Sequence, residues 1–232
     1  MPKFPTIDVV MAMRNLLDKD SQLMVLDKLR ELTWDINPRI WICVKWLSTY
    51  FSIRPKEMLS LREKDVDIKR ESFIVPPVHD KTGRGKVIPM LPEDVELAGF
   101  LPRSLDREQP FFRHTPAKPT RWTTVHTERM VPGKQFRHDY ISSWWDRACA
   151  AVGIVGVSLY PGTKHTSVSA LCEEFTPEQI RTSSRISTNE AFSRYFQPNP
   201  KMVKLIYEAA RGDGKVTDIL SLKRSSRTRN YL

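Results

Sequence analysis

The segment between residues 66 and 89 carries the one clear β pattern of this 232-residue chain, and it constrains the fold more than any other segment. Three short apolar runs and a turn-rich stretch make up the pattern, at 66–68, 72–76, 86–89 and 80–85. Pro76 and Pro89 favour strand ends or sheet edges, because proline cannot donate a hydrogen bond to a neighbouring strand. The segment therefore predicts a small antiparallel sheet with a glycine-containing turn at its tip.

Helical periodicity occupies most of the remaining chain. The leucines at positions 23, 26, 29 and 32 mark one face of a helix. Asn37-Pro38 is typical of the start of another helix, whose apolar residues on more than one side predict burial. Further helices are expected after Pro55 and at 92–101, 138–152, 164–174, 177–183, 188–196 and 200–211. The predicted fold class is mainly α with a small antiparallel β-sheet (α+β).

Residues 102–135 interrupt this periodicity with five prolines, which predicts a long surface connection. The stretch is also basic. It is suited either to approaching a phosphate backbone or to forming a solvated loop.

The charge balance points to a polyanionic partner. The chain has 37 Lys and Arg residues against 27 Asp and Glu residues, a net charge of +10 with a pI near 9.6. Such a surplus favours nucleic acid first and an anionic membrane surface second. No apolar run approaches the ~20 residues that span a bilayer, so the membrane alternative rests on charge alone.

The three cysteines, Cys43, Cys149 and Cys172, lack the spacing of a metal site. Cys43 and Cys149 lie within apolar helical patterns, which predicts buried, reduced thiols and a cytosolic protein. The five histidines are dispersed as well, so no metal site is expected.

Four short motifs follow one another in an order that suits phosphate chemistry. They are Arg54 with Glu57 three residues later, Lys81-Thr82-Gly83, Gly162-Thr163-Lys164-His165-Thr166, and the run from Ser187 to Tyr195. A phenol attacks phosphorus only where it is activated and where cations neutralise the phosphate. Taken alone, Tyr195 is more typical of an aromatic residue at the end of an amphipathic helix.

Together the motifs resemble those of the tyrosine recombinases, or phage integrases, over roughly residues 35–197. The third motif is similar to the family's second arginine box, Arg-His-Ser/Thr, with Lys164 in the arginine position. The resemblance implies a site-specific DNA recombinase or integrase, of the kind that mobile elements carry. Such an enzyme cleaves and rejoins DNA through a 3′-phosphotyrosyl intermediate.

The resemblance also implies a role for each residue. Tyr195 is expected to be the nucleophile, Arg54 and Lys164 the cations on the phosphate, and Lys81 the acid that protonates the leaving 5′-oxygen. His165 is expected to be a buried, hydrogen-bonded imidazole. Contacts with DNA are expected from Lys86, Arg84, Arg185 and Arg194. No metal or other cofactor is required.

Two of these assignments have alternatives. The alternative for Arg54 is a merely structural salt bridge with Glu57 one turn later. Where Arg54 binds the phosphate, Glu57 is expected to orient it. Lys86 competes with Lys81 for the role of general acid.

Departures from the family's pattern lie within the motifs themselves. Lys164 keeps the charge of arginine but lacks its two-pronged geometry. Pro161 stands where the family often has His, and Ile186 stands nine residues before Tyr195, where the family has His or Trp. If each lost contact costs about 2–4 kcal/mol, the chemistry slows by roughly 10³-fold or more. The alternatives are therefore a slow or partner-dependent enzyme, a degenerate DNA-binding module of the same fold, and a basic helical domain that binds RNA or protein.

Three regions are expected along the chain. They are an N-terminal arm and helix at 1–34, a catalytic domain at 35–197, and a C-terminal helix with a basic tail at 198–232. The last region is a candidate for exchange between protomers of a homo-oligomer on double-stranded DNA, with accessory DNA-bending or directionality proteins as further partners. Family members commonly carry an N-terminal DNA-clamping domain, so the sequence represents a trimmed chain, a catalytic domain alone or a fragment. The expected location is the cytoplasm, in association with the nucleoid.

Overall fold

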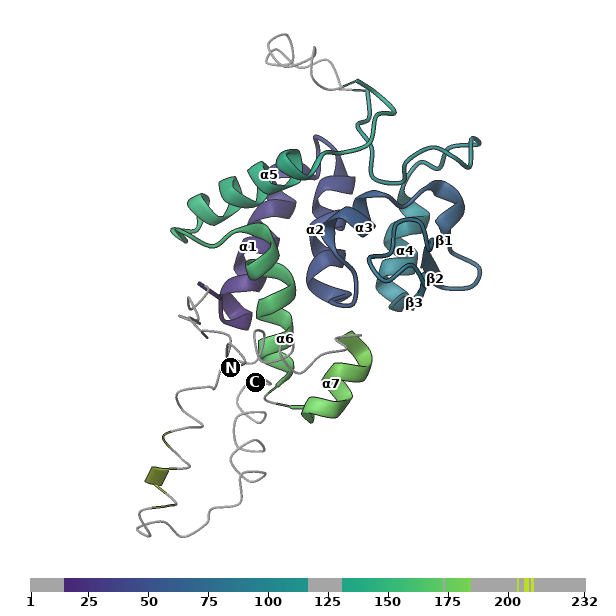
Figure 1. The fold of residues 1–232 in the computed structure, drawn as a ribbon. Coiled ribbons are helices and arrows are strands. Elements are labelled where there is room, and N and C mark those ends of the chain that lie inside the picture. Colours follow the sequence, from purple (N-terminus) through teal and green to yellow (C-terminus); the bar gives the residue numbers. More distant parts are fainter. Residues whose placement is uncertain are drawn as a thin grey trace, which may run out of the picture.

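The described part of the chain is mostly helical, with one small sheet beside the helices (Figure 1). The structure, a computed structural model, describes residues 15–116, 131–172 and 174–184, together with Lys204, Tyr207, Glu208 and Ala210. The helices are α1 (Lys19–Thr33), α2 (Pro38–Thr49), α3 (Pro55–Leu59), η1 (Glu63–Asp65), α4 (Pro92–Phe100), α5 (His138–Ala151), η3 (Pro161–His165), α6 (Thr166–Leu171) and α7 (Pro177–Ser184). The strands are β1 (Val66–Asp67), β2 (Ser72–Val75) and β3 (Lys86–Pro89).

The sheet confirms the β pattern of the sequence. Its order is β1-β2-β3, and both pairs are antiparallel, with Phe73 of β2 opposite Val66 on one side and Ile88 on the other. Phe73 faces inward and is fully buried, whereas the neighbouring Ile74 is exposed, as the two-residue period of a strand requires. The connection from β2 to β3 is a long loop, and Gly85 near its end adopts a positive φ of 72°.

Helix α2 lies at the centre of the core, which confirms the burial expected from its apolar sequence. Asn37 accepts a hydrogen bond from the backbone N–H of Arg39 and so caps the helix that Pro38 begins. Trp46 stacks on Phe73 of the sheet, with ring centroids 5.3 Å apart. Helix α2 therefore joins the sheet to the other helices.

The expected surface connection is wrong for part of its length. Phe111 and Phe112 are fully buried, and Phe111 stacks on Trp46 at a centroid distance of 5.6 Å. Two adjacent aromatic side chains remove a large apolar area from water, which a solvent-exposed loop cannot do. This segment is therefore part of the core. Residues 117–130 of the connection lie outside the described part.

The buried face of α1 also differs from the expected row of leucines. Val25, Leu26 and Leu29 are buried, as is the polar Gln22, whereas Leu23 is about half exposed. A face at three- and four-residue spacing from Gln22 contains these positions and excludes Leu23. Helix α1 packs on α2 and α5 through this face.

Besides α5, two further elements from the second half of the chain, η3 and α6, pack against the first two helices. A single helix was expected at 164–174, but the structure has the π-helix η3 followed by α6. Helices α5 and α7 agree with their expected ranges. The expected helix at 188–196, and all but four residues of the one at 200–211, lie outside the described residues. In the described part, no helix is both long and apolar enough to cross a membrane.

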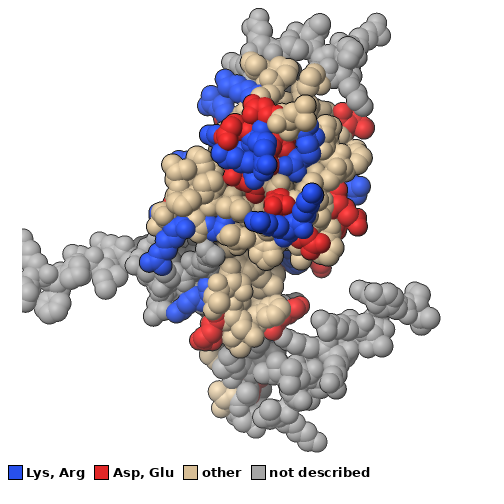
Figure 2. Space-filling view, turned by 90° about the vertical axis from the view of Figure 1, so that its right-hand side faces the viewer, with Lys and Arg blue, Asp and Glu red and all other residues tan. Residues whose placement is uncertain are grey.

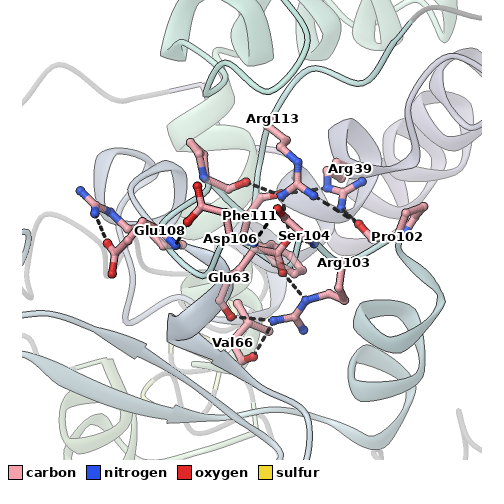
Figure 3. A network of polar contacts seen from close by, with 12 residues as sticks. Arg39, Glu63, Val66, Pro102, Arg103, Ser104, Asp106, Glu108, Phe111 and Arg113 are labelled. Atoms are coloured by element: carbon pink, nitrogen blue, oxygen red, sulfur yellow. Dashed lines mark hydrogen bonds and ion pairs between the residues drawn. The ribbon is translucent and has the colours of Figure 1, made fainter.

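The buried carboxylate of Glu63 binds arginine side chains from the segment that follows α4 (Figure 3). Arg103 and Arg113 both pair with it, the latter with Nη1 2.5 Å from Oε1. Arg39 of α2 donates a hydrogen bond to the carbonyl of Phe111 at 2.8 Å. Burial, with the nearby charge of Arg113, lowers the pKa of Arg39 to about 10. The guanidinium groups of Arg39, Arg103 and Arg113 thus bind groups of the protein itself. Arg103 and Arg113 belong to the basic connection expected at 102–135, and they stabilise the fold.

Candidate phosphate-binding cleft

A cleft of about 600 Å³ brings together residues that lie far apart in the sequence. Its lining residues are Arg54, Pro55, Lys56, Glu57, His79, Lys81, His138 and Tyr160. They come from α3, from the loop between β2 and β3, from the first residue of α5 and from the residue before η3. Arg54 and Lys81, two of the expected catalytic residues, therefore line the same cavity.

Arg54 is positioned by the start of α3. Pro55 occupies the first helical position, where its missing N–H and fixed φ are favourable. Glu57 accepts the Arg54 backbone N–H at 2.9 Å, which satisfies an amide that the helix leaves without a partner. The guanidinium Nη1 lies 3.5 Å from the Glu57 carboxylate, and the Arg54 side chain stays 38% exposed. Arg54 can therefore form the salt bridge with Glu57 and line the cleft at the same time.

Glu57 also holds the loop that carries Lys81. This buried carboxylate accepts a hydrogen bond from the Lys81 backbone N–H at 3.3 Å. The Lys81 residue itself is exposed and lines the cleft. The loop backbone is therefore fixed to α3, while the lysine side chain faces solvent.

Lys86 differs from the expectation that it contacts DNA. Its side chain is only 6% exposed, and its ammonium lies 2.7 Å from Glu57 and 3.2 Å from Asp80. It also donates to the carbonyl of Ser52 at 3.1 Å. An ammonium buried between two carboxylates is removed from the surface, because separating it from them leaves uncompensated buried charge. Lys86 therefore joins β3 to α3 instead of facing a ligand.

Asp80 shapes the turn between Lys81 and Lys86. It accepts hydrogen bonds from the Thr82 hydroxyl and from the backbone N–H of Gly85 at 3.2 Å. Burial by itself raises the pKa of the Asp80 carboxyl, but the Thr82 hydrogen bond and the Lys86 ammonium hold the pKa well below its ordinary value. Arg84 lies exposed in this turn and is not among the residues that line the cleft.

Lys164 lies in η3 and is 4% exposed. Burial lowers its pKa to about 8, and the positive charges of Arg54 and Lys86 act in the same direction, opposed by Glu57. This mutual influence means that three of the expected cations share one electrostatic environment around the Glu57 carboxylate. The Lys164 ammonium lies 5.9 Å from the centroid of the Tyr160 ring.

His165 is 1% exposed, and its ring meets the Tyr160 ring edge to face, with centroids 4.8 Å apart. Pro161, which occupies the position expected to hold a histidine, is not among the residues that line the cleft. The adjacent Tyr160 lines it instead.

Several expected site residues lie outside the described part of the chain. These are Tyr195, Arg185 and Arg194, together with Ile186. Their positions relative to the cleft therefore remain predictions.

The cleft also contains two residues that the motifs do not include, His79 and His138. They are 59 positions apart in the sequence, and tertiary packing alone places them together. The role of Asp80 could have been predicted from its neighbours. The sequence Asp80-Lys81-Thr82-Gly83 is typical of a turn in which the Asp side chain accepts hydrogen bonds from the residues that follow it. Among the described residues, no three His, Cys, Asp or Glu side chains gather as metal ligands.

Basic side chains are interspersed with acidic ones on the face shown in Figure 2. Exposed basic residues are also paired with acidic ones, since Arg62 and Lys64 both bind the carboxylate of Glu108, the latter at 2.6 Å. Exposed pairs of this kind are weak and are screened by salt. The positive charge available to a polyanion is therefore smaller than the number of basic residues.

The fold is similar to those of solved recombinases and integrases. The crystal structure of XerA recombinase matches with a TM-score of 0.60 and 17% identity, over 91% of this chain and 66% of that one. The Tn1549 transposon integrase, in complex with a circular intermediate DNA, matches with a TM-score of 0.58 and 14% identity, over 88% of this chain and 68% of that one. The integrase from mycobacterium phage Brujita matches with a TM-score of 0.52 and 16% identity, over 88% and 65%.

The chain thus spans about two thirds of the length of each of these structures. No protein-family model matches the sequence, and no curated protein matches it either. The structural likenesses confirm the expected fold class. The chain has the mostly helical fold, with a small antiparallel sheet, of tyrosine recombinase catalytic domains.

Proposed function

We propose that this chain is the catalytic domain of a tyrosine recombinase that cleaves and rejoins double-stranded DNA through Tyr195. The observation that carries the proposal is the cleft in which Arg54 and Lys81 meet, with Lys164 within electrostatic reach and Glu57 joining the segments. The proposal is further supported by the fold, since one similar structure is a transposon integrase in complex with DNA.

The chemistry requires cations around a phosphate. The Tyr195 phenol loses its proton to solvent as its oxygen attacks phosphorus and forms a phosphotyrosyl bond, while the bond from phosphorus to the 5′-oxygen breaks and that oxygen takes a proton from Lys81. Negative charge gathers on the non-bridging oxygens in the transition state, where Arg54 and Lys164 stabilise it. A free 5′-hydroxyl reverses these steps and rejoins the strand. The energy of the phosphoester bond is kept, so no external energy source is required.

The assembly follows from the same proposal. Strand exchange joins two DNA duplexes, so more than one copy of the chain acts on the DNA at once. We therefore propose a homo-oligomer on DNA, with the C-terminal region exchanged between protomers and accessory DNA-bending or directionality proteins as further partners. Arg84, Arg185 and Arg194 are proposed as DNA contacts.

The test is a nicked suicide substrate, from which the cleaved strand end diffuses away and traps the covalent intermediate. The wild-type chain is expected to give a denaturation-resistant protein–DNA adduct, and Tyr195→Phe to give none. An adduct that persists in Tyr195→Phe would refute Tyr195 as the nucleophile. DNA bound tightly by the wild-type chain, without any adduct, would refute the enzyme.

A second candidate function, a DNA-binding module without cleavage, is favoured by the lowered pKa of Lys164 in a position expected to hold arginine. A lysine whose positive charge is lost as the pH rises through about 8 is a weaker phosphate ligand there than a permanently charged guanidinium. Tight, salt-sensitive binding of DNA without an adduct supports this alternative.

A further inference from the structure

The turn that leads into α6 beside the cleft is a π-helix. In η3 the backbone N–H of Thr166 reaches back five residues to the carbonyl of Pro161, where a regular α-helix would reach back four. Turns of this kind are rare and lie frequently at functional sites. Their presence in a well-packed region indicates that the surrounding residues hold them in place.

Two contacts hold this turn. A Cβ atom on Gly162 would lie 2.2 Å from Cζ2 of Trp145, so glycine alone lets the turn pack against this ring. In the second contact, the fully buried side-chain amide of Gln22 donates to the carbonyls of Gly162 and Thr163, at 2.8 and 2.9 Å. A buried amide with partners in the turn itself gives that turn a specific geometry.

Tyr160 is the residue that accompanies Lys164 at the cleft. Residues four positions apart lie on the same face of a helix, one turn apart. The Tyr160 ring lies 5.9 Å from the Lys164 ammonium, and Tyr160 lines the cleft with Arg54 and Lys81.

Tyr160 brings a chemical group that the cations do not supply. Its phenol is a directional, neutral hydrogen-bond donor, and the ring that carries it is braced by the buried His165 at a centroid distance of 4.8 Å. A phosphate bound between Arg54 and Lys81 would lie in the cavity that Tyr160 also lines. Donors that are already oriented stabilise developing charge without the cost of rearrangement.

We infer that Tyr160 is a phosphate ligand of this cleft, whose hydroxyl donates a hydrogen bond to a non-bridging oxygen of the scissile phosphate. The inference rests on the proposed function, because it assigns a further residue to the same site. It also gives a role to the residue that precedes Pro161, the position where the family often has His.

The test compares Tyr160→Phe, which removes the hydroxyl and keeps the ring, with the wild-type chain on the suicide substrate. Adduct formation is expected to slow by roughly 10- to 100-fold, with less than a threefold change in DNA affinity. Tyr140→Phe is the matched control, because Tyr140 packs against His114 and Phe136 and is not among the residues that line the cleft, so the change is expected to leave the rate unchanged. Equal urea midpoints for all three proteins exclude a folding defect.

A second substrate separates a contact with phosphate from a structural role. In a methylphosphonate, a neutral methyl group replaces one non-bridging oxygen of the scissile phosphate. If Tyr160 binds that oxygen, the effects of Tyr160→Phe and of the methyl group are not additive, and the variant loses little on one of the two stereoisomers. Full additivity on both stereoisomers, or a wild-type rate for Tyr160→Phe on the natural substrate, overturns the inference and leaves the proposed function intact.

The two proposals also fail separately. If the wild-type chain forms no adduct, the proposed cleavage is refuted, and affinity for DNA decides the role of Tyr160. Affinity is then measured on duplexes with either a phosphate or a methylphosphonate at the scissile position. A preference for the phosphate that weakens severalfold in Tyr160→Phe supports the ligand, and an unchanged preference overturns it.

Discussion

The ammonium of Lys86 lies 2.7 Å from the carboxylate of Glu57, and this buried ion pair joins the strand after the Lys81 loop to the helix after Arg54. Glu57 accepts hydrogen bonds from the Arg54 and Lys81 backbones as well. One carboxylate thus fixes the two segments that carry the cations of the cleft. The salt bridge between Arg54 and Glu57 is part of this arrangement, so it is compatible with a functional Arg54.

Glu57→Gln is expected to destabilise the fold by about 3–5 kcal/mol, because it leaves the buried Lys86 ammonium without half of its compensating charge. The free energy of unfolding in urea measures the loss. Glu108→Gln is the control: that carboxylate also pairs with two cations, but in solvent, and its loss is expected to change stability little. Similar effects of the two substitutions would contradict the role of Glu57 as the central contact.

Substitutions at Lys81 and Lys86 are expected to have different effects, the first on the cleavage rate and the second on stability. Lys86→Met leaves the carboxylates of Glu57 and Asp80 buried without their cation and is expected to destabilise the fold by several kcal/mol. Lys81→Met removes an exposed side chain and is expected to leave the urea midpoint almost unchanged while it slows adduct formation.

A modified leaving group then identifies the proton donor. If Lys81 protonates the 5′-oxygen, a substrate with sulfur in that bridging position restores the rate of Lys81→Met, because a thiolate leaves without a proton. The same substrate is not expected to rescue Arg54→Ala, whose lost contact is with the non-bridging oxygens. Failure to rescue Lys81→Met would assign the proton to another group.

Lys164 predicts a decline in the cleavage rate at alkaline pH. Its pKa is lowered from the ordinary value to about 8, chiefly by burial, so the fraction that carries a positive charge falls as the pH rises through 8. The second-order rate constant for adduct formation reports the free protein and is expected to fall above that pH. Lys164→Arg should keep its charge, retain or increase the rate at pH 7, and extend it to higher pH.

Lys45→Arg is the control for this experiment, because Lys45 pairs with Asp94 at 2.5 Å in another part of the fold. It is expected to keep the wild-type pH profile. A large loss of rate at pH 7 in Lys164→Arg would instead indicate a site rebuilt around the shape of lysine.

Local signals account for the parts of the fold that could be predicted. Proline after Asn37, two-residue alternation around Phe73 and the glycines beside Lys81 act through neighbouring residues, and each expected element forms. The burial of Phe111 and the approach of His79 to His138 depend on distant packing, which no local pattern contains.

The same division applies to the candidate site. The motifs identified Arg54 and Lys81, which line one cleft. They did not reveal that Lys86 is buried, because a lysine in a strand has the same sequence pattern whether its partner is water or a carboxylate. Tyr160 precedes the motif that contains Lys164, and only tertiary packing places it in the cleft with Arg54 and Lys81.

Gly162→Ala is expected to destabilise the fold by about 1–3 kcal/mol, because the new methyl group would overlap the Trp145 ring and force the π turn or the ring to move. Gly99→Ala is the matched control. Gly99 lies in α4 with open space around the new methyl group, so the same change there is expected to stabilise the fold by roughly 0.4–1 kcal/mol. Opposite signs in urea unfolding support the packing argument, whereas equal stabilisation would show that the turn relaxes freely. Because the turn also orients Tyr160, Gly162→Ala should slow adduct formation at a urea concentration where the variant is still folded.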